Sequence, residues 1–472
     1  MPSTSFVHTK IVCTLGPASS SPEVLRSLME AGLNVARINF SHGTHEEHAA
    51  VIATVRRLAA ELERPVAILG DLQGPRIRVG ALDEPISLAD GADVVLAPED
   101  IARAGEIPIT YGALSDDVRV GDRVLMDDGL IELVVAAVER PRVRARVVHG
   151  GLLRSHKGMN LPGVAVSAPS ITDKDRADIA FAVAQELDYL ALSFVRRAED
   201  IASLRALIPK WMLVVAKIEK DTALANIRSI VEASNAVMVA RGDLGVELPF
   251  EEVPIAQKRI IAVANALGRP VITATQMLES MVTNPRPTRA EASDVANAIL
   301  DGTDAVMLSA ETATGHYPEL AVRAMTRISR EIEAHPMPRP QRPHGRREND
   351  VPVATEDAIA AATAAAAASL GAPIVMVITK SGFTARIVAS YRPAVPIFAL
   401  TDVERTYRQL ALVRGVIPAL VAPAATYEEM FEHGRALLRR LGLAQPGDRI
   451  LVTAGVPFDV PGTTNLLRVE VV

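Results

Sequence analysis

The run YLALSFV at residues 189–195 is followed by four more short apolar segments, LVVAKIE (213–219), AVMVA (236–240), VITA (271–274) and AVMLS (305–309). Three similar segments precede them, at residues 10–15, 36–40 and 66–72. Helical periodicity fills the intervals, most clearly at residues 22–31, 46–62, 173–185, 252–266 and 289–300. Because alternating strands and helices are typical of a parallel sheet, these eight units predict a closed (β/α)8 barrel. An open, doubly wound sheet has the same local pattern, so periodicity alone leaves closure undecided.

A different pattern interrupts this alternation after its third strand. Residues 76–168 carry short strand-like runs separated by turn signals such as Asp128-Gly129, which predicts an inserted β-rich domain. The barrel is then divided into residues 1–75 and 169–335, and a domain hinged over its strand ends is well placed to act as a lid.

The last third of the chain predicts a separate domain. Residues 336–352 are proline-rich and polar, which is typical of a linker. Residues 353–472 alternate helices with strands and predict a C-terminal α/β domain. Its expected strands are residues 374–379, 397–400, 450–453 and 466–472.

Composition excludes several classes of function. The chain has 472 residues, 49% of them hydrophobic and 22% charged, and a net charge of −6, so no broad basic surface is available for nucleic acid or anionic lipid. The single cysteine, Cys13, lies in an apolar run and is expected to be a small buried residue. Neither a signal peptide nor an apolar run of about 18 residues is visible, so we expect a cytoplasmic protein that does not contact the membrane.

Polar side chains gather where the predicted barrel strands end. Alternation along a strand directs Lys217 and Glu219 to the same side, and Arg37 and Asp243 follow other strands of the barrel. Two carboxylates without histidine or cysteine suit Mg²⁺ or Mn²⁺, and a lysine beside that ion requires an anion between them. This cluster is typical of phosphoryl transfer. Each part also has a structural interpretation, with Lys217 and Glu219 as an ion pair and Arg37 as a cap on a carboxylate.

Seven segments of the chain, taken in order, resemble the pyruvate kinase family. They are KIVCTLGPA (10–18), RINFSHG (37–43), KGMNLPG (157–163), AKIE (216–219), MVARGDLGVE (238–247), ATQMLESM (274–281) and PRPTRAE (285–291). The resemblance covers essentially the whole chain. It implies a cytoplasmic, homotetrameric glycolytic enzyme that uses Mg²⁺ and transfers the phosphoryl group of phosphoenolpyruvate to ADP, giving pyruvate and ATP. It also implies that the C-terminal domain is regulatory.

The resemblance also assigns roles at the substrate site. Glu219 and Asp243 would bind the divalent ion, Lys217 would neutralise the phosphoryl group in transfer, and Arg37 would hold the substrate phosphate. The substrate carboxylate would be received by the amides around Gly242 and Asp243 together with the Thr275 hydroxyl. The remaining implied residues are Ser309 and Glu311, at the far end of a water relay near Thr275 that protonates the enolate, and Asn39, Ser41, His42, Arg78 and Lys157 on the nucleotide side.

The family's potassium pocket is altered in this chain. It corresponds to Asn39, Ser41, Asp71 and the carbonyl of Leu72, and its potassium-dependent members have Thr-Lys after the aspartate and glutamate after Gly-Pro. In this chain Leu72 and Gln73 replace the Thr-Lys pair, and Arg76 replaces the glutamate. A fixed guanidinium can supply the positive potential of a bound ion and repel that ion, so we predict that potassium is not required.

A loop in the C-terminal domain resembles the family's effector site. It consists of Thr379, Lys380, Ser381, Gly382, Phe383 and Thr384, between a predicted strand and helix. Its hydroxyls and amides suit the phosphate of a phosphorylated effector, and the alternative is a plain surface turn. The aromatic Phe383 leaves the effector's identity open. A second departure from the family, Ala310 in place of a common glycine, affects only local backbone.

Two other functions compete with this interpretation. A metal-dependent aldolase or lyase also binds a pyruvate enolate, but it needs neither the inserted domain nor a transfer lysine such as Lys217. A catalytically silent sugar-phosphate sensor is the second, and the competent residue at every catalytic position argues against it. Formation of ATP that depends on both substrates separates phosphoryl transfer from the aldolase or lyase reaction, and detectable turnover would eliminate the silent sensor.

Overall fold

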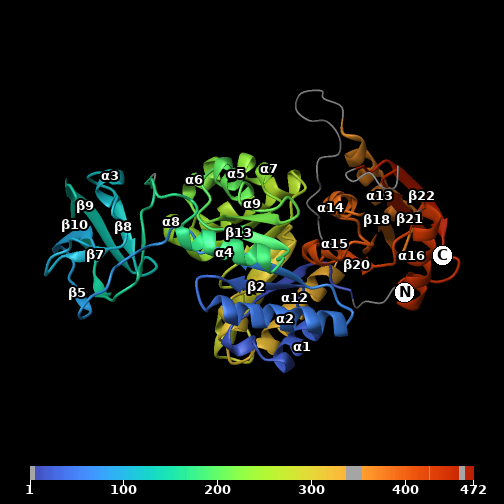
Figure 1. The fold of residues 1–472 in the computed structure, drawn as a ribbon, viewed down its shortest axis with the longest axis horizontal. Coiled ribbons are helices and arrows are strands. Elements are labelled where there is room, and N and C mark those ends of the chain that lie inside the picture. The colour runs from blue at the N-terminus through green and yellow to red at the C-terminus, as the bar shows by residue number, and fades with distance from the viewer. Residues whose placement is uncertain (1–5, 165, 336–352, 425, 457–462) are drawn as a thin grey trace.

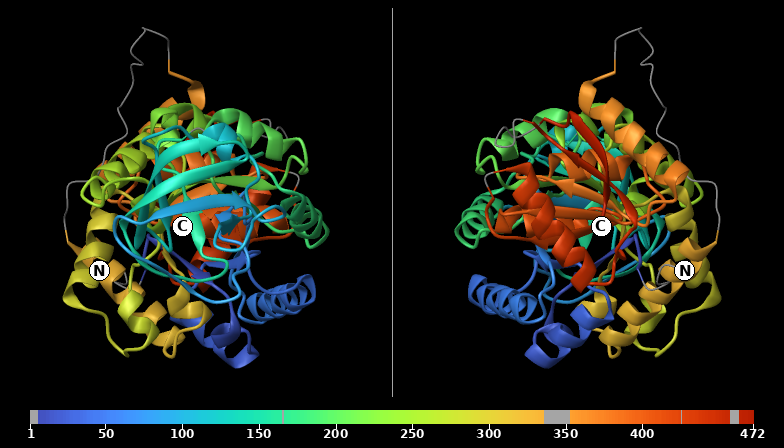
Figure 2. Two further views of the ribbon diagram at one scale, coloured as in Figure 1. Left: turned by 90° about the vertical axis from the view of Figure 1, so that its left-hand side faces the viewer. Right: turned by 90° about the vertical axis from the view of Figure 1, so that its right-hand side faces the viewer.

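The structure is a computed structural model that describes residues 6–164, 166–335, 353–424, 426–456 and 463–472. Three bodies lie in a row, with the inserted β-rich region at one end, the barrel in the middle and the C-terminal α/β region at the other end (Figure 1). Views along the long axis have the inserted strands in front of the barrel from one side and the C-terminal domain in front of it from the other (Figure 2). The predicted linker, residues 336–352, lies outside the described residues.

Within the described ranges, eight parallel strands close into a barrel in the order β1-β17-β16-β15-β14-β13-β3-β2, as predicted. The strands are β1 (Lys10–Thr14), β2 (Val35–Asn39), β3 (Ala67–Asp71), β13 (Tyr189–Leu192), β14 (Leu213–Ile218), β15 (Ala236–Ala240), β16 (Val271–Ala274) and β17 (Ala305–Leu308). Closure rests on the pairing of the first strand with the last, where Val12 lies opposite Met307. Periodicity could not supply that long-range pairing.

Each barrel strand is buried on both faces, which explains its nearly continuous apolar sequence. Inward-facing side chains such as Val12, Leu69, Met238 and Ile272 form one core cluster. Outward-facing side chains join a larger core with the surrounding helices. Those helices are α1 (Pro22–Ala31), α2 (His45–Glu61), α4 (Asp173–Ala184), α5 (Ala198–Arg205), α7 (Ile227–Ala233), α9 (Val253–Ala266), α10 (Arg289–Asp301) and α12 (Pro318–Ala334).

Several of these helices begin at the predicted residues because a side chain caps their first turn. The Thr44 hydroxyl accepts the amide of Glu47, and Thr172 and Thr288 cap α4 and α10 in the same way. Three shorter helices directly follow barrel strands, namely α6 (Asp221–Ala225), α8 (Arg241–Glu247) and α11 (Ala310–Ala313). They stand at the carboxyl ends of β14, β15 and β17, where the functional side chains lie.

The inserted region is β-rich, as predicted. Its seven-stranded sheet has the order β4-β12-β8-β9-β10-β6-β7, and a two-stranded sheet pairs β11 with β5. A separate apolar cluster fills it. The elements are β4 (Ile77–Arg78), β5 (Ile86–Leu88), β6 (Asp93–Pro98), β7 (Ile107–Ile109), α3 (Leu114–Asp117), β8 (Arg123–Met126), β9 (Ile131–Glu139), β10 (Arg142–His149), β11 (Gly151–Leu153) and β12 (Gly158–Asn160). The domain boundaries at residues 75/76 and 168/169 stay a prediction.

The C-terminal region is an α/β domain with a five-stranded sheet in the order β20-β19-β18-β21-β22. The sequence did not predict β20 (Val416–Leu420), because its Pro418 argues against a strand, and β20 lies at an edge, where proline is tolerated. The other strands are β18 (Val375–Ile378), β19 (Ile397–Thr401), β21 (Arg449–Ala454) and β22 (Leu466–Val471), and the helices are α13 (Thr355–Leu370), α14 (Phe383–Ser390), α15 (Glu404–Gln409), η3 (Leu410–Leu412) and α16 (Tyr427–Arg440).

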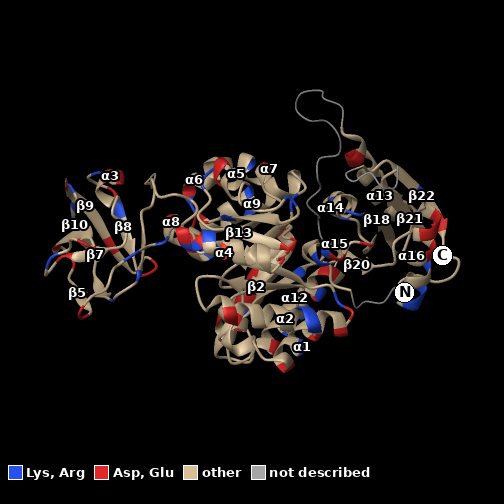
Figure 3. Cartoon of the chain, in the orientation of Figure 1, with Lys and Arg blue, Asp and Glu red and all other residues tan. Residues whose placement is uncertain are grey.

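Two global features accompany this architecture. Among the described helices, none combines the length and the apolar character needed to cross a bilayer. Lysine and arginine are interspersed with aspartate and glutamate over the elements in view (Figure 3).

Candidate active site

A buried network of charged side chains lies inside the barrel at the carboxyl ends of its strands. Arg37 Nε donates to Asp71 Oδ2 at 2.7 Å, and Lys217 Nζ lies 3.2 Å from Asp71 Oδ1. Lys217 Nζ also lies 2.8 Å from Glu219 Oε1 and donates to Ser193 Oγ at 2.7 Å. The structure therefore brings together Arg37, Lys217 and Glu219, which the sequence predicted to meet, and adds Asp71 at their centre.

The charges in this network shift one another's pKa. Burial lowers the pKa of Lys217, but the carboxylates of Asp71 and Glu219 outweigh burial, and the net pKa lies above its ordinary value. Burial raises the pKa of Asp71, but Lys217 and Arg37 more than offset it, and the net pKa is low. The Lys217 ammonium is therefore held as a cation inside the barrel. In this environment a positive charge attracts a bound anion more strongly than it does in water.

The two predicted metal ligands, Glu219 and Asp243, follow the neighbouring strands β14 and β15. Glu219 is 1% exposed, and its Oε2 accepts the amide of Phe194 at 2.6 Å. Burial raises the pKa of Glu219, Lys217 opposes this, and the negative charge of Asp243 raises it further. Asp243 lies in the first turn of α8 with its side chain 33% exposed, and Arg76 Nη2 is 3.8 Å from its Oδ1. Within the described ranges, no three His, Cys, Asp or Glu side chains form a metal site by themselves.

Thr275 stands against the start of α8. Its φ of 71° and that of Gln276, 53°, place both residues in the left-handed region, a strained conformation for a β-branched threonine. A Cβ added at Gly242 would lie 2.9 Å from Thr275 Cγ2, so only glycine allows this approach. The structure thus brings together Gly242, Asp243 and Thr275, as the sequence predicted.

Ser309 and Glu311, the predicted far end of the proton relay, are bonded to each other and to the loop after β16. Glu311 is fully buried, and its two oxygens accept the amides of Ser309 (2.7 Å) and Leu278 (3.0 Å). Its carboxylate therefore fastens the loop after β16 to the loop after β17. The role of both residues in a proton relay stays a prediction.

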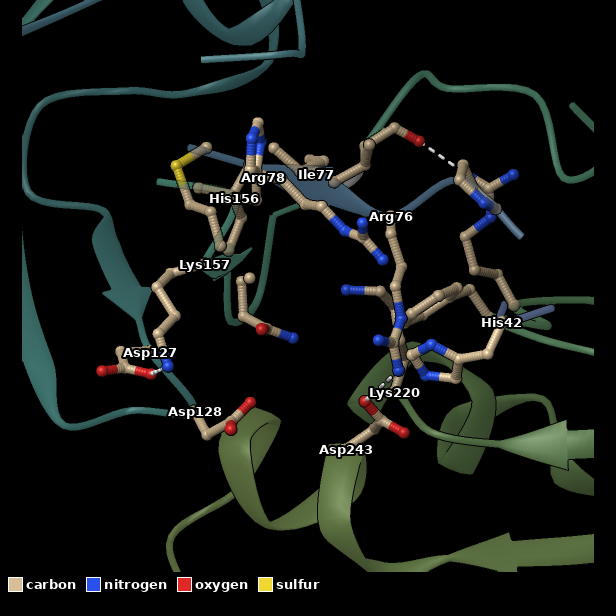
Figure 4. A pocket seen from close by; sticks show the side chains of 18 residues that line it. His42, Arg76, Ile77, Arg78, Asp127, Asp128, His156, Lys157, Lys220 and Asp243 are labelled. Atoms are coloured by element: carbon tan, nitrogen blue, oxygen red, sulfur yellow. Dashed lines mark hydrogen bonds and ion pairs between the residues drawn. The ribbon is translucent and has the colours of Figure 1, made fainter. Parts of the chain in front are cut away.

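A cleft of about 350 Å³ separates the barrel from the inserted region. Figure 4 has Asp127, Asp128 and Lys157 on the inserted-domain side, and His42, Lys220 and Asp243 on the barrel side. Of the predicted nucleotide-binding residues, His42, Arg78 and Lys157 line it. Lys157 also pairs with Asp127 at 2.7 Å. The fourth, Asn39, is not part of this lining, and its Oδ1 accepts the amide of Ser41.

The groups of the predicted potassium pocket have partners within the protein. Both Asp71 oxygens face cations, and the Leu72 carbonyl accepts the Ser193 hydroxyl at 2.7 Å. The Leu72 side chain is 1% exposed and packs in the barrel core. Arg76 is 41% exposed, and its guanidinium lies beside Asp243.

The predicted effector loop lies in the C-terminal domain, away from the barrel site. Gly382 adopts a φ of 75°, and its amide donates to Thr379 Oγ1 at 3.0 Å. Lys380 Nζ lies 2.8 Å from Asp402 Oδ2. Arg386 donates to the Ser381 carbonyl at 2.6 Å, and Thr384 Oγ1 is 2.8 Å from Thr464 Oγ1.

Sequence reasoning missed several residues that complete the site. Ser193 and Thr14 bond Lys217 and Arg37, and both are ordinary hydroxyl residues at apolar strands. Lys220 and Glu247 form a buried ion pair at 2.7 Å, with side chains 12% and 1% exposed. The adjacency of Lys220 to Glu219 was the one available signal, and nothing in the sequence linked it to Glu247.

Fold and site together define a barrel enzyme that binds anionic substrates next to two carboxylates, a lysine and an arginine. The chain belongs to the pyruvate kinase family. The family model "Pyruvate kinase, barrel domain" matches residues 6–322, and "Pyruvate kinase, alpha/beta domain" matches residues 357–470.

Individual relatives agree over nearly the whole chain. A pyruvate kinase of Geobacillus stearothermophilus is 48% identical over 98% of this chain and 80% of its own length. One from Clostridium acetobutylicum is 42% identical over 98% of this chain and 99% of its own length. The crystal structure of a pyruvate kinase from Cryptosporidium parvum has a TM-score of 0.91 at 35% identity, covering 98% of this chain and 96% of that one.

Proposed function

We propose that this chain transfers the phosphoryl group of phosphoenolpyruvate to ADP at the carboxyl ends of the barrel strands. The observation that carries this is the Lys217 ammonium, which is buried between Asp71, Glu219 and Ser193 and kept charged. Phosphoryl transfer depends mainly on positioning and on neutralising the charge of the group in transfer. A preorganised cation in a buried site supplies that neutralisation.

The residues present fit a magnesium ion. Glu219 and Asp243 supply two carboxylates without nitrogen or sulfur ligands, and Mg²⁺ is ordinarily held by one or two carboxylates with substrate oxygens and water. When bound, Mg²⁺ would neutralise negative charge on the substrate's carboxylate and phosphoryl oxygens. Mn²⁺ has the same preference for oxygen and is expected to substitute.

The protein's own groups then divide the work. Arg37 and Lys217 bind and neutralise the phosphoryl group, and the amides at the start of α8 with the Thr275 hydroxyl receive the substrate carboxylate. Thr275 lies against Gly242, so it orients the same end of the substrate. Ser309 and Glu311 support the loops around Thr275, from which we expect the proton to reach the enolate carbon. His42, Arg78 and Lys157 line the cleft that we assign to the nucleotide, whereas Asn39 is not part of its lining.

Potassium is unnecessary in this proposal. Of the oxygens that would bind it, the two of Asp71 face the cations Arg37 and Lys217, and the Leu72 carbonyl accepts the Ser193 hydroxyl. Arg76 adds positive charge near Asp243 rather than an acidic group. Arg37 and Lys217 balance the charges of Asp71 and Glu219, so this network has no net negative charge to attract a third cation.

We also assign a phosphorylated effector to the loop from Thr379 to Thr384. The left-handed Gly382 directs the loop into α14, whose first amides lie next to the hydroxyls of Ser381 and Thr384. The Lys380 side chain is 33% exposed and pairs with Asp402, and we expect its ammonium to contribute positive charge to the phosphate site. If no sugar phosphate or nucleotide changes the phosphoenolpyruvate concentration at half-maximal rate, the loop is structural.

A cytoplasmic homotetramer is the assembly that we propose. Ile255 (68% exposed) on α9 and Phe250 (85%), which precedes this helix, present apolar side chains on the barrel. Val469 and Val471, both more than half exposed, lie on the edge strand β22 of the C-terminal domain. Two separate apolar surfaces on one chain suit an assembly with two kinds of interface. Sedimentation of the purified chain tests this.

The direct test of the function is ATP formation. The purified protein, given phosphoenolpyruvate, ADP and Mg²⁺, should form pyruvate and ATP in equal amounts. Omitting ADP or the metal should abolish both products. Consumption of phosphoenolpyruvate without ADP, or no turnover under any condition, would contradict the proposal.

A further inference from the structure

Helix α8 contacts both the substrate site and the inserted domain. Its first turn contains Gly242 and Asp243, and its last residue, Glu247, accepts a bond at Oε1 from Asn160 Nδ2 at 3.0 Å. Asn160 ends β12 in the inserted sheet. Gly129 of the inserted domain lies nearby, since a Cβ added there would be 3.9 Å from Val246 Cγ1. The inserted domain therefore rests on the end of the same short helix that forms part of the substrate site.

Glu247 holds a second partner with the same oxygen. Lys220 Nζ lies 2.7 Å from Glu247 Oε1, while Oε2 is buried and has no hydrogen-bond partner within the described part of the chain. The Glu247 side chain is 1% exposed and that of Lys220 12%. A buried ion pair of this kind adds little net stability compared with apolar residues of the same size, so its presence asks for another explanation.

The position of Lys220 explains why the pair is present. Lys220 directly follows Glu219 and lines the cleft together with Asp243 and Asn160. Its ammonium also lies 6.0 Å from the centre of the Phe194 ring, whose amide holds Glu219. We propose that Glu247 is a positioning residue that couples the seating of the inserted domain to the placement of the Lys220 ammonium in the cleft. The inference rests on the proposed function, since the cleft is assigned there to the nucleotide.

The coupling follows from the shared oxygen. When Asn160 is seated, Glu247 Oε1 is fixed from both sides, and Lys220 is drawn to the rim of the cleft. When the inserted domain swings away, Asn160 no longer bonds Glu247. The Glu247 carboxylate then keeps only Lys220 as a partner and can rotate. Lys220 then no longer has one defined position in which to meet the phosphates of a nucleotide. A neutral or absent side chain at position 247 has the same consequence.

A double-mutant cycle tests this coupling. Asn160→Ala and Glu247→Gln should each raise KM for ADP at least fivefold, while KM for phosphoenolpyruvate changes less than twofold. The double variant should exceed the larger single effect by no more than twofold, because both changes act through one contact. Glu251→Gln, an exposed acidic residue just after α8, is the matched control and should leave both constants unchanged. Multiplicative effects, or unchanged KM values, would overturn the proposal.

Hydrogen–deuterium exchange separates this proposal from the proposed function. Residues 158–160 of the full chain should exchange at least threefold faster in Asn160→Ala and in Glu247→Gln than in the wild type or in Glu251→Gln. Unchanged exchange would overturn the coupling even in an active enzyme. Absence of ATP formation by the wild type would instead overturn the proposed function and leave the exchange result standing.

Discussion

The two ends of the barrel are joined to their neighbouring domains in opposite ways. At the base, where the strands begin, Ala411 and Leu412 of the C-terminal domain enter the core cluster inside the barrel. At the catalytic end, where the strands finish, Asn160 of the inserted domain bonds Glu247 of α8 beside an open cleft. Apolar packing inside a core resists separation, whereas a few polar contacts beside a cleft allow motion.

Charged pairs repeat this contrast. At the base, Arg408 Nε lies 3.1 Å from Asp188 Oδ1, with side chains 14% and 0% exposed. At the catalytic end, Arg76 and Asp243 are 3.8 Å apart, with side chains 41% and 33% exposed. Breaking the buried pair leaves an uncompensated charge, while the exposed pair separates at little cost. The protein thus keeps its stability at one end and its chemistry at the other.

The largest effect is expected at the catalytic end. Lys217→Met should lower turnover by at least roughly 10²–10³-fold, as when one preorganised electrostatic donor is lost, because its charge acts on the group in transfer. Methionine keeps the length of the side chain but leaves Asp71 and Glu219 without their shared cation, so thermal unfolding is measured alongside and turnover is compared per folded enzyme. Steady-state ATP formation measures the effect. A variant that keeps more than a tenth of wild-type turnover would refute the assigned role.

At the base, Leu412→Ala should affect stability instead of chemistry. Removal of a fully buried leucine costs about 2–5 kcal/mol, through lost burial and the cavity that remains. The thermal unfolding transition should fall, while kcat of the folded enzyme stays within twofold of wild type. Leu420→Ala, at a 45% exposed position of the same domain, is the control. An unchanged transition in Leu412→Ala would show that the packing of Leu412 inside the barrel does not hold the two domains together.

A buried lysine at the base should give a pH-dependent stability. Lys10 donates to the Val416 carbonyl at 2.7 Å, and burial lowers its pKa to about 8, with Glu333 opposing and Arg414 assisting. The folded state therefore binds fewer protons than the unfolded state between pH 8 and 10.5, so the unfolding free energy rises with pH across that window. Relative to Lys10→Met, the wild type should gain at most about 3 kcal/mol there. A pH-independent difference between the two proteins would contradict this.

The smallest effect concerns potassium. In Tris or tetraalkylammonium buffer with Mg²⁺, adding potassium should change the rate less than twofold, because Asp71 is already paired with Arg37 and Lys217. Activation by tenfold or more would refute potassium independence. Arg76→Glu should lower activity in potassium-free buffer, since it replaces the cation beside Asp243 with a like charge.

The sequence predicted the eight strand–helix units and the cluster of Arg37, Lys217 and Glu219 from local pattern, whereas barrel closure rests on the long-range pairing of β1 with β17. Strand alternation fixes which side chains face inward, and the closed barrel brings strand ends together. It did not predict Asp71 as the partner of both cations, because register between strands is a long-range property. For the same reason it missed Glu247, whose two partners lie 27 and 87 residues away along the chain. The sequence also did not predict that Glu311 accepts the backbone amides of Ser309 and Leu278, because every residue except proline has such an amide.

Hydrogen–deuterium exchange of the wild-type chain compares the two ends most directly. Residues 410–412 should exchange slowest and be unaffected by ligand, because Ala411 and Leu412 pack inside the barrel core and Leu410 is buried in the core of the C-terminal domain. Residues 158–160 should exchange at least tenfold faster, and ADP with Mg²⁺ should slow them as the inserted domain closes. Equal exchange at the two ends, or protection by ligand at residues 410–412 alone, would contradict the division into a fixed base and a moving catalytic end.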